Sequence, residues 1–359
     1  MYNIGIIGLG FLGGSLAKSL KSTDIVNKII AYDIDIDSLK LAKNENVITD
    51  YSDKIDDKFY ECDIVFICTP VKYIPIIEQE LDKVVNENCI ITDTGSTKKK
   101  IIEQSKKLHR EFVGGHPMVG SERSGYKTSK EFLFENSYYI ITKSPKSTDR
   151  AINTLKDLIL AIKAIPIIID EDKHDYITAT ISHVPHVIAF SLVSLVKQLD
   201  DKNETMKNLA AGGFKDITRI ASSDPLMWEN ICSENKDEIL KILSIFKEII
   251  NQFEQNISNS EITYNFIDSA KKYRDSFINK KVNGNTMPEL NINIKDENGA
   301  LAKIVNILSD NDIGIKNIEI LNNRENNYGV LKIVFYTYEQ MEKAYKILKE
   351  FGYEVKENT

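Results

Sequence analysis

Reactive side chains follow apolar runs of strand length at three places in this chain. Thr69 and Pro70 follow the first run, Ser96 follows the second, and His116 follows the third. These runs alternate with helical patterns, which is typical of a mainly parallel sheet. The carboxyl ends of parallel strands open on one edge of the sheet, where ligands bind. We therefore expect Thr69, Ser96 and His116 to face one crevice.

His116 is the strongest candidate for proton transfer. It stands on an expected loop between Gly114-Gly115 and Pro117, so glycine permits an unusual backbone before it and proline restricts the backbone after it. An imidazole titrates near neutral pH and can accept a proton from a substrate. The alternative is a buried histidine that hydrogen-bonds the turn, and we favour the catalytic interpretation.

The four other histidines have plainer interpretations. His109 lies among basic residues and is expected on a solvated helix. His174 is expected near a helix start, with a smaller claim on the site. His183 and His186 flank Pro185 within a helical pattern, and proline kinks a helix. No third ligand converges with them in the sequence, so we expect no metal site.

Two cations, Lys215 and Arg219, are four residues apart in a helical pattern and would share one helix face. Such a pair suits a substrate carboxylate, because arginine offers two parallel donors and lysine a point charge. A surface ion pair with Asp216 or Asp224 is the plainer alternative. The three lysines at 98–100 are expected to form a solvated helix face.

A glycine-rich turn near the N-terminus predicts dinucleotide binding. Gly8, Gly10 and Gly13 form G-x-G-x-x-G between an apolar run and a helical pattern, and Asp33 ends the next apolar run. The helix N-terminus favours a diphosphate, and the carboxylate accepts ribose hydroxyls. No arginine follows Asp33, so NAD is favoured over NADP; a glycine turn without nucleotide is the alternative. The expected NAD contacts are Gly8, Gly10, Phe11, Leu12, Gly13, Asp33, Thr69 and Pro70.

Composition excludes several classes of function. The chain has 359 residues, 42% of them hydrophobic, and a net charge of -7, which argues against a nucleic-acid or anionic-membrane surface. Its four cysteines show no pairing pattern and are expected to be reduced thiols of a cytoplasmic protein. No run reaches about 18 uninterrupted apolar residues, so we expect no membrane span.

The patterns divide the chain into three domains. Residues 1–168 are expected to form a Rossmann-type α/β domain that binds NAD, and residues 169–282 an all-α domain for substrate binding and dimerisation. The apolar stripe from Ile239 to Phe253 exceeds what a small core needs, so we expect part of it to form a homodimer interface. A linker at 283–288 precedes a βαββαβ ferredoxin-like unit at 289–359.

Taken together, these stretches resemble the prephenate dehydrogenase family, which includes arogenate dehydrogenases. The matching segments are GLGFLGGSLA (8–17), DTGSTK (93–98), GGHPMVGSE (114–122), ISHVPHVIA (181–189) and GGFKDITRIASSDPLMW (212–228). The tail, IKDENGALAKIVNILSDNDIGIKNIEI (294–320), is similar to an ACT domain, a module that binds amino acids. The family's turn is often G-x-I-G-G, whereas Phe11 and Leu12 precede Gly13-Gly14 here, a mild change that leaves the turn intact.

The resemblance implies NAD-dependent oxidative decarboxylation of prephenate to 4-hydroxyphenylpyruvate. By the same resemblance, His116 would accept the proton of the 4-hydroxyl, Ser96 would hydrogen-bond that hydroxyl, and Arg219 would hold the side-chain carboxylate. The other substrate contacts would be Lys215, His186, Ser121 and Glu122. Tyrosine is the expected feedback ligand of the ACT domain.

Three alternatives stay open. An arogenate dehydrogenase would differ in accepting an amino group where prephenate carries a keto group. A non-catalytic regulator could sense NAD and amino acids, but it would not need His116, Ser96 and Arg219 together. A β-hydroxyacid dehydrogenase would use a catalytic lysine, for which Lys215 is the candidate, and would leave the GGHP segment unexplained.

Overall fold

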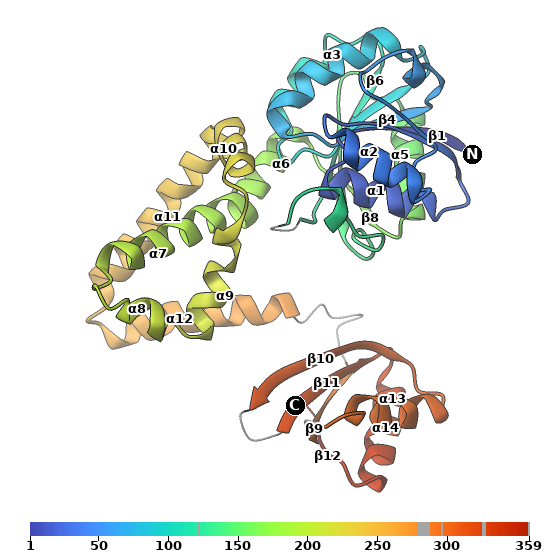
Figure 1. The fold of residues 1–359 in the computed structure, drawn as a ribbon. Helices are drawn as coiled ribbons and strands as arrows, with labels where there is room; N and C mark the ends of the chain where they lie inside the picture. The colour runs from blue at the N-terminus through green and yellow to red at the C-terminus, as the bar shows by residue number, and fades with distance from the viewer. Residues whose placement is uncertain (121–122, 279–287, 296, 325–327, 358–359) are drawn as a thin grey trace. The chain divides into compact units, whose positions relative to one another are not determined.

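The computed structural model describes residues 1–120, 123–278, 288–295, 297–324 and 328–357. Contacts divide the chain into two compact units, Met1–Ile249 and Ile250–Thr359. Figure 1 labels the helices and strands of both units. The expected linker at 283–288 lies, except for Pro288, outside the described residues.

An eight-stranded sheet organises the first unit. Its strands lie in the order β3-β2-β1-β4-β5-β6-β7-β8, and the first six have the parallel 3-2-1-4-5-6 arrangement of a dinucleotide-binding fold. Strand β7 runs antiparallel to β6, and β8 runs parallel to β7. The expected Rossmann-type sheet is confirmed. The strands are β1 (Tyr2–Ile7), β2 (Val26–Tyr32), β3 (Asp50–Ser52), β4 (Ile64–Ile67), β5 (Ile90–Asp93), β6 (Glu111–Pro117), β7 (Tyr138–Lys143) and β8 (Ile165–Ile168).

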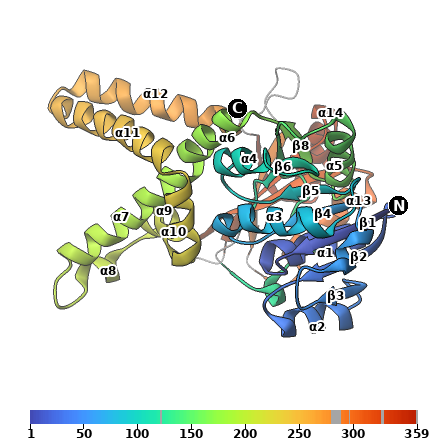
Figure 2. The same ribbon diagram turned by 90° about the horizontal axis from the view of Figure 1, so that it is seen from above.

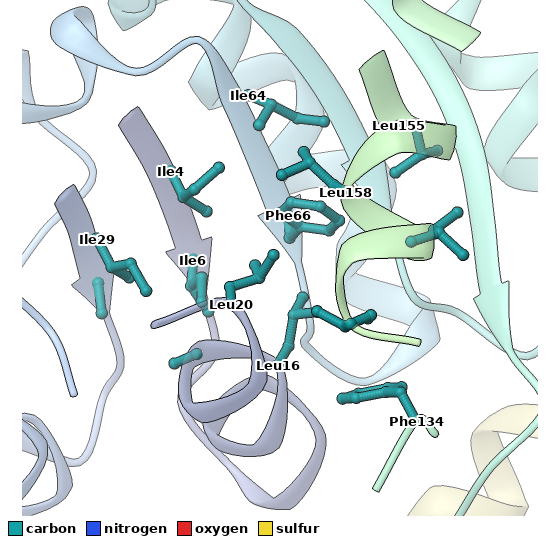
Figure 3. Close-up of a cluster of buried hydrophobic side chains, with 14 of the residues drawn as sticks. Ile4, Ile6, Leu16, Leu20, Ile29, Ile64, Phe66, Phe134, Leu155 and Leu158 are labelled. Carbon is teal, nitrogen blue, oxygen red and sulfur yellow. The ribbon is translucent and has the colours of Figure 1, made fainter. Parts of the chain in front are cut away.

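Helices cover both faces of this sheet. Along β1, Ile4 and Ile6 point into one core, and Ile7 lies in the other, as strand alternation requires. Figure 3 shows Leu16 and Leu20 packed in the first core beside Phe66. The flanking helices are α1 (Phe11–Lys21), α2 (Ile36–Asn44) and α5 (Asp149–Ala161) on the first core, and α3 (Ile74–Val84) and α4 (Lys99–Ser105) on the second. Because both faces are buried at the centre of the sheet, a strand such as β4 (IVFI) is an apolar run without polar alternation.

The position of His116 differs from the prediction of a loop. His116 is part of β6 and pairs with Ile140 of β7. The antiparallel partner extends the strand past the glycines, because its hydrogen bonds keep the backbone of β6 in the sheet as far as Pro117. The histidine is therefore held by a ladder rather than by a turn.

The helical part of the first unit begins with one continuous helix over Glu171–Leu199. It consists of α6 (Glu171–Thr178), a π-helical turn (Ala179–His183) and α7 (Val184–Leu199). Pro185 has no N–H to donate, and the π turn lies directly before it. The later helices of this unit are α8 (Thr205–Leu209), α9 (Gly212–Thr218), α10 (Pro225–Glu234) and the first part of α11 (Lys236–Asn256). The end of α11, from Ile250, and α12 (Ser260–Ile278) belong to the second unit. Figure 2 shows α6 and α7 as one run from the sheet domain.

That continuous helix has an apolar surface the sequence analysis missed. By length and composition it is the one helix in the described ranges that could cross a membrane, with a mean hydropathy of 1.6 over 18 residues. Scattered polar residues interrupt the apolar runs, so counting uninterrupted residues did not find it. Only 22% of this window is buried within the chain. A single such helix is weak evidence for a membrane span, because helices of soluble proteins pass the same test.

The C-terminal unit, which runs from Glu289 to Glu357 within the second compact unit, has the predicted βαββαβ order. Its four-stranded antiparallel sheet has the order β10-β11-β9-β12. Alternate residues of β9, Leu290, Ile292 and Ile294, lie in one core with Ile304 and Leu348 of the two helices. This is the ferredoxin-like arrangement of an ACT-like domain. The elements are β9 (Glu289–Lys295), α13 (Ala300–Asp310), β10 (Ile315–Arg324), β11 (Tyr328–Phe335), α14 (Tyr338–Glu350) and β12 (Glu354–Glu357).

Candidate active site

The glycine turn has the geometry that a diphosphate requires. Gly8 has φ of +94°, and a Cβ on Gly13 would lie 1.9 Å from the carbonyl oxygen of Gly8. These two glycines are explained by the chain itself. Gly10 is the N-cap of α1, and a Cβ added there would meet nothing within 4 Å. The space beside Gly10 and the free N–H groups of α1 therefore fit the close approach of a dinucleotide diphosphate.

Asp33 follows β2 and holds the turn from the other side. Its carboxylate accepts hydrogen bonds from the backbone N–H of Leu9 at 2.5 Å and of Asp35 at 2.8 Å. A carboxylate has about four lone-pair sites, so acceptor capacity remains for ribose hydroxyls. Thr69 packs against Gly8, and its buried hydroxyl has no hydrogen-bond partner within the described part of the chain. Pro70 follows it at the end of β4.

Two glycine substitutions should separate folding from cofactor binding. Gly13→Ala should lower the free energy of unfolding by about 2 kcal/mol or more, because its Cβ collides with the Gly8 carbonyl. Gly10→Ala should leave the free energy of unfolding nearly unchanged and weaken NAD binding. Urea unfolding and NAD titration by fluorescence measure the two effects. Equal stability losses in both variants would contradict this assignment.

A chain of three side chains leads to His116. The Asp175 carboxylate lies 2.7 Å from Nδ1 of His174, and Nε2 of His174 lies 2.8 Å from Nδ1 of His116. His174 and Asp175 are buried on α6. The same carboxylate accepts the backbone N–H of Lys98 at 2.7 Å and of Lys99 at 3.0 Å, so it caps the N-terminus of α4. Asp175 thus joins the helical part to the sheet domain.

These contacts fix the tautomer of each imidazole. An ionised carboxylate only accepts, so Nδ1 of His174 carries the proton that faces Asp175. Nε2 of a neutral His174 is then an acceptor, and Nδ1 of His116 donates to it. The remaining nitrogen of His116, Nε2, has a lone pair that none of the described residues occupies. The arrangement prepares His116 to accept a proton.

Electrostatics keep this pair of imidazoles neutral. Burial, then the neighbouring His174 and the charge of Lys98, hold the pKa of His116 well below 6.5. Burial also lowers the pKa of His174, against the opposing effect of the hydrogen bond that His174 donates to Asp175. The pKa of Asp175 is lowered by its hydrogen bond with His174, although burial acts in the opposite direction. His116 is therefore an unprotonated base at neutral pH.

His183 and His186 lie on the π turn and α7, next to α10. His186 stacks on Trp228 with ring centroids 3.8 Å apart, and His183 meets Trp228 edge-on at 6.0 Å. The indole N–H of Trp228 is buried without a hydrogen-bond partner among the described residues. Asn235 donates to the Asp175 carbonyl at 2.9 Å and to Nδ1 of His183 at 3.1 Å, and burial lowers the pKa of His183 to about 4.

The cations lie differently from the prediction. Helix α9 ends at Thr218, and Arg219 begins a 3₁₀ turn, so Lys215 and Arg219 do not share one α-helix. Both side chains are exposed, and both elements pack near α7, which carries His186. The predicted substrate contacts Ser121 and Glu122 lie outside the described residues.

Two further expectations were wrong. Lys98 has no exposed surface, although Lys99 and Lys100 are exposed as expected. His109 lies after α4 rather than within a helix, and its exposed ring pairs with Asp82. Sequence reasoning also gave too little weight to His174 and did not name Asp175 or Trp228 as site residues. The adjacent His174-Asp175 pair, an imidazole beside a carboxylate, was the available signal.

The Rossmann-type sheet, its open glycine turn and the acid after the second strand define an NAD-binding oxidoreductase. Family models support this class and make it specific. The model described as prephenate dehydrogenase, nucleotide-binding domain, matches residues 16–168, and that described as prephenate dehydrogenase, dimerization domain, matches residues 170–272. The chain belongs to the prephenate dehydrogenase family.

Similar proteins span nearly the whole chain. Prephenate dehydrogenase of Bacillus subtilis (strain 168) is 36% identical over 349 residues, covering 94% of this chain and 93% of that protein. Prephenate dehydrogenase of Lactococcus lactis subsp. cremoris is 31% identical, covering 98% of each. The crystal structure of prephenate dehydrogenase from A. aeolicus with hydroxyphenyl propionate and NAD+ has a TM-score of 0.74 and 32% identity, covering 77% of this chain and 98% of that one.

Proposed function

We propose that the protein catalyses NAD-dependent oxidative decarboxylation of prephenate to 4-hydroxyphenylpyruvate. The Asp175–His174–His116 chain is the observation that carries this proposal, because it leaves Nε2 of His116 as a proton acceptor. Relatives named prephenate dehydrogenase match at 36% and 31% identity. A similar structure holds a hydroxyphenyl compound together with NAD+, which fits this substrate class.

In the proposed reaction His116 accepts the proton of the substrate 4-hydroxyl at Nε2 as that oxygen becomes a carbonyl. Bound NAD would supply the hydride acceptor, and the hydride would leave the ring carbon that carries the 4-hydroxyl. Loss of the ring carboxylate as CO2 leaves its electron pair to the ring, which becomes aromatic as a phenolate, and the proton held by His116 returns to the phenolate oxygen to give the phenol. Ser96, three residues past the buried end of β5, would hydrogen-bond the reacting hydroxyl. The protein therefore contributes orientation and one proton acceptor.

Arg219 is proposed to hold the side-chain carboxylate of the substrate, with Lys215, His186, Ser121 and Glu122 around it. Arg219→Ala should raise KM for prephenate about tenfold or more, because a charged hydrogen bond is lost. The value of kcat should change less. Steady-state kinetics measure both constants, with exposed Lys207→Ala as the control. An unchanged KM would place the carboxylate clamp elsewhere.

A homodimer in the cytoplasm is the assembly we propose. The match to the dimerization-domain model covers α7 and α11, and both helices expose large apolar side chains. A second copy would bury this surface at a gain of about 25 cal/mol per Å². The described cysteines are all free, which fits a reducing compartment. The exposed side chains are Val193, Leu195, Leu199, Leu240, Ile245 and Ile249.

Tyrosine is the proposed effector of the ACT-like unit. Deleting residues 286–359 should abolish inhibition by tyrosine and retain turnover, because the unit has its own core. Initial rates with and without tyrosine measure the effect, and circular dichroism checks that the shortened chain is folded. Tyrosine inhibition that persists in a folded, shortened enzyme would place the effector site outside this unit.

The reaction itself is tested by NADH formation at 340 nm. Purified protein and NAD are offered prephenate and arogenate separately. Turnover of prephenate supports the proposal, and turnover of arogenate alone would replace it with arogenate dehydrogenation by the same fold. No turnover of either, with NAD bound, would favour a non-catalytic sensor. NADP in place of NAD tests the selectivity expected from Asp33.

A further inference from the structure

A fully buried ion pair lies below the candidate active site. Nζ of Lys98 lies 2.5 Å from Oδ2 of Asp93, and neither side chain has exposed surface. The ammonium also donates to the carbonyl oxygens of Gly95 at 2.7 Å and Thr97 at 3.0 Å. Gly95 and Thr97 flank Ser96, and Asp93 lies three residues before it. Through these contacts the Lys98 ammonium holds residues 93–98, which include Ser96, in a closed loop.

Asp93 connects this segment to the strand of His116. Its Oδ2 accepts the backbone N–H of Gly95 at 2.8 Å, and its Oδ1 accepts the backbone N–H of Gly115 at 3.0 Å. Gly115 directly precedes His116. One carboxylate therefore holds the backbone on both sides of the proposed site, next to Ser96 and next to His116.

The glycines beside Ser96 and His116 leave room for this ion pair. A Cβ on Gly95 would lie 2.9 Å from Oδ2 of Asp93, and a Cβ on Gly114 would lie 3.1 Å from Cδ of Lys98. A Cβ on Gly115 would lie 2.4 Å from the backbone oxygen of Asp93. The three glycines let the segments close around the two charged side chains. A buried ion pair is a weak source of stability, so its presence asks for another role.

We propose that Lys98 and Asp93 form a positioning pair that holds Ser96 against the strand of His116 and fixes the Lys98 cation beside that strand. The proposal rests on the proposed function for the role of His116. Neither residue is placed in contact with the substrate. Lys98 and Asp93 act through the two residues that are.

The charges that surround His116 support the electrostatic part. The Lys98 charge lowers the pKa of both His116 and His174, after the larger effect of burial. His183 on the π turn also lowers the pKa of His116. Asp175 on α6 faces His174 and opposes these effects. Among the described neighbours that lower the pKa of His116, Lys98 is the permanently charged one.

The remaining titratable neighbours are neutral near pH 7. Glu78 of α3 is fully buried, and both its carboxyl oxygens lack a hydrogen-bond partner in the described ranges. Burial, then the charge of Asp93, raises its pKa to about 9. Burial raises the pKa of Cys68 to about 12 and that of Tyr139 well above 10. Lys98 and Asp93 form the buried ion pair at the C-terminal end of β5.

Opposite pH shifts in two variants test the proposal. Lys98→Met removes the cation, so His116 should protonate at a pH higher by about one unit. Asp93→Asn leaves the cation unpaired, so His116 should protonate at lower pH. The direct readout is an NMR titration of ¹³C-labelled histidine Cε1, where the chain gives five signals. His116→Asn assigns its signal, and Lys106→Met, which breaks an exposed pair with Glu103, is the control.

A second readout is the pH profile of kcat/KM for prephenate. The midpoint of its acidic limb should lie at higher pH in Lys98→Met and at lower pH in Asp93→Asn. A purely structural disturbance would lower kcat/KM in both variants without moving the two midpoints in opposite directions. If Lys98→Met does not fold, Asp93→Asn is compared with the double variant, in which the limb and the NMR midpoint should lie higher by about one pH unit. Equal midpoints would overturn the proposal. The NMR readout needs no turnover, so a wild type inactive on prephenate rejects the proposed function separately.

Discussion

Replacing His116 with asparagine should lower kcat roughly 10³-fold, as expected for the loss of a general base. The contacts that motivate this result leave Nε2 of His116 as a free acceptor, since Nδ1 faces His174 at 2.8 Å. An asparagine amide cannot accept the proton of the substrate hydroxyl at neutral pH. Binding of NAD should persist, because the glycine turn is untouched. Steady-state rates and NAD titration measure the two quantities.

The pH dependence of the wild type is part of the same prediction. His116 acts when neutral, so activity falls as the pH drops through its pKa. Burial, His174 and Lys98 hold that pKa well below 6.5, so kcat/KM should stay level through pH 6.5 and fall only in more acidic solution. His109→Asn, which removes an exposed imidazole, is the matched control and should leave the rate unchanged. Unchanged turnover in His116→Asn would remove His116 as the proton acceptor.

Replacing His174 with phenylalanine should lower kcat by roughly 10²-fold with little change in KM. Phenylalanine keeps an aromatic ring in the buried space but removes the acceptor for Nδ1 of His116. His116 then loses its fixed tautomer and orientation, although its own ring remains. The Asp175 carboxylate keeps the backbone donors of Lys98 and Lys99, so the cap of α4 should survive.

A double variant shows whether His174 acts through His116. If it does, His116→Asn with His174→Phe should be no slower than His116→Asn alone, because the second change has nothing left to orient. Independent contributions would instead multiply the two losses. Multiplicative losses, or full activity in His174→Phe, would contradict the relay.

The sheet domain could be predicted because its signals are local. Apolar runs of four to seven residues, separated by helical patterns, identify strands buried on both faces. Gly8 and Gly13 have the backbone roles expected of them, because Gly8 has a positive φ and a Cβ on Gly13 would meet the Gly8 carbonyl. The alternation of Leu290, Ile292 and Ile294 likewise identified the first strand of the C-terminal unit. Each of these patterns lies within about 30 residues of sequence.

Two of the three errors have the same physical cause, which is contact with a segment distant along the chain, and the third is a helix that ends early. Lys98 looked solvated because its sequence neighbours are lysines, yet it is buried by Asp93 and by the segment of Gly114. His116 was expected on a loop because its strand partner is Ile140, 24 positions later. Arg219 was placed on the helix of Lys215, but the α-helical hydrogen bonds end at Thr218.

By itself, the sequence determined the two α/β architectures and the glycine turn, and it singled out the acid expected to favour NAD and the histidine proposed as the base. Only the tertiary structure showed which side chains orient that histidine and set its protonation state. His174 lies 58 positions from His116, and Asp175 lies 77 from Lys98, so only the packing of α6 against the sheet brings them into contact. Local periodicity encodes which element forms, whereas protonation states depend on burial and on charges that the fold collects from distant segments.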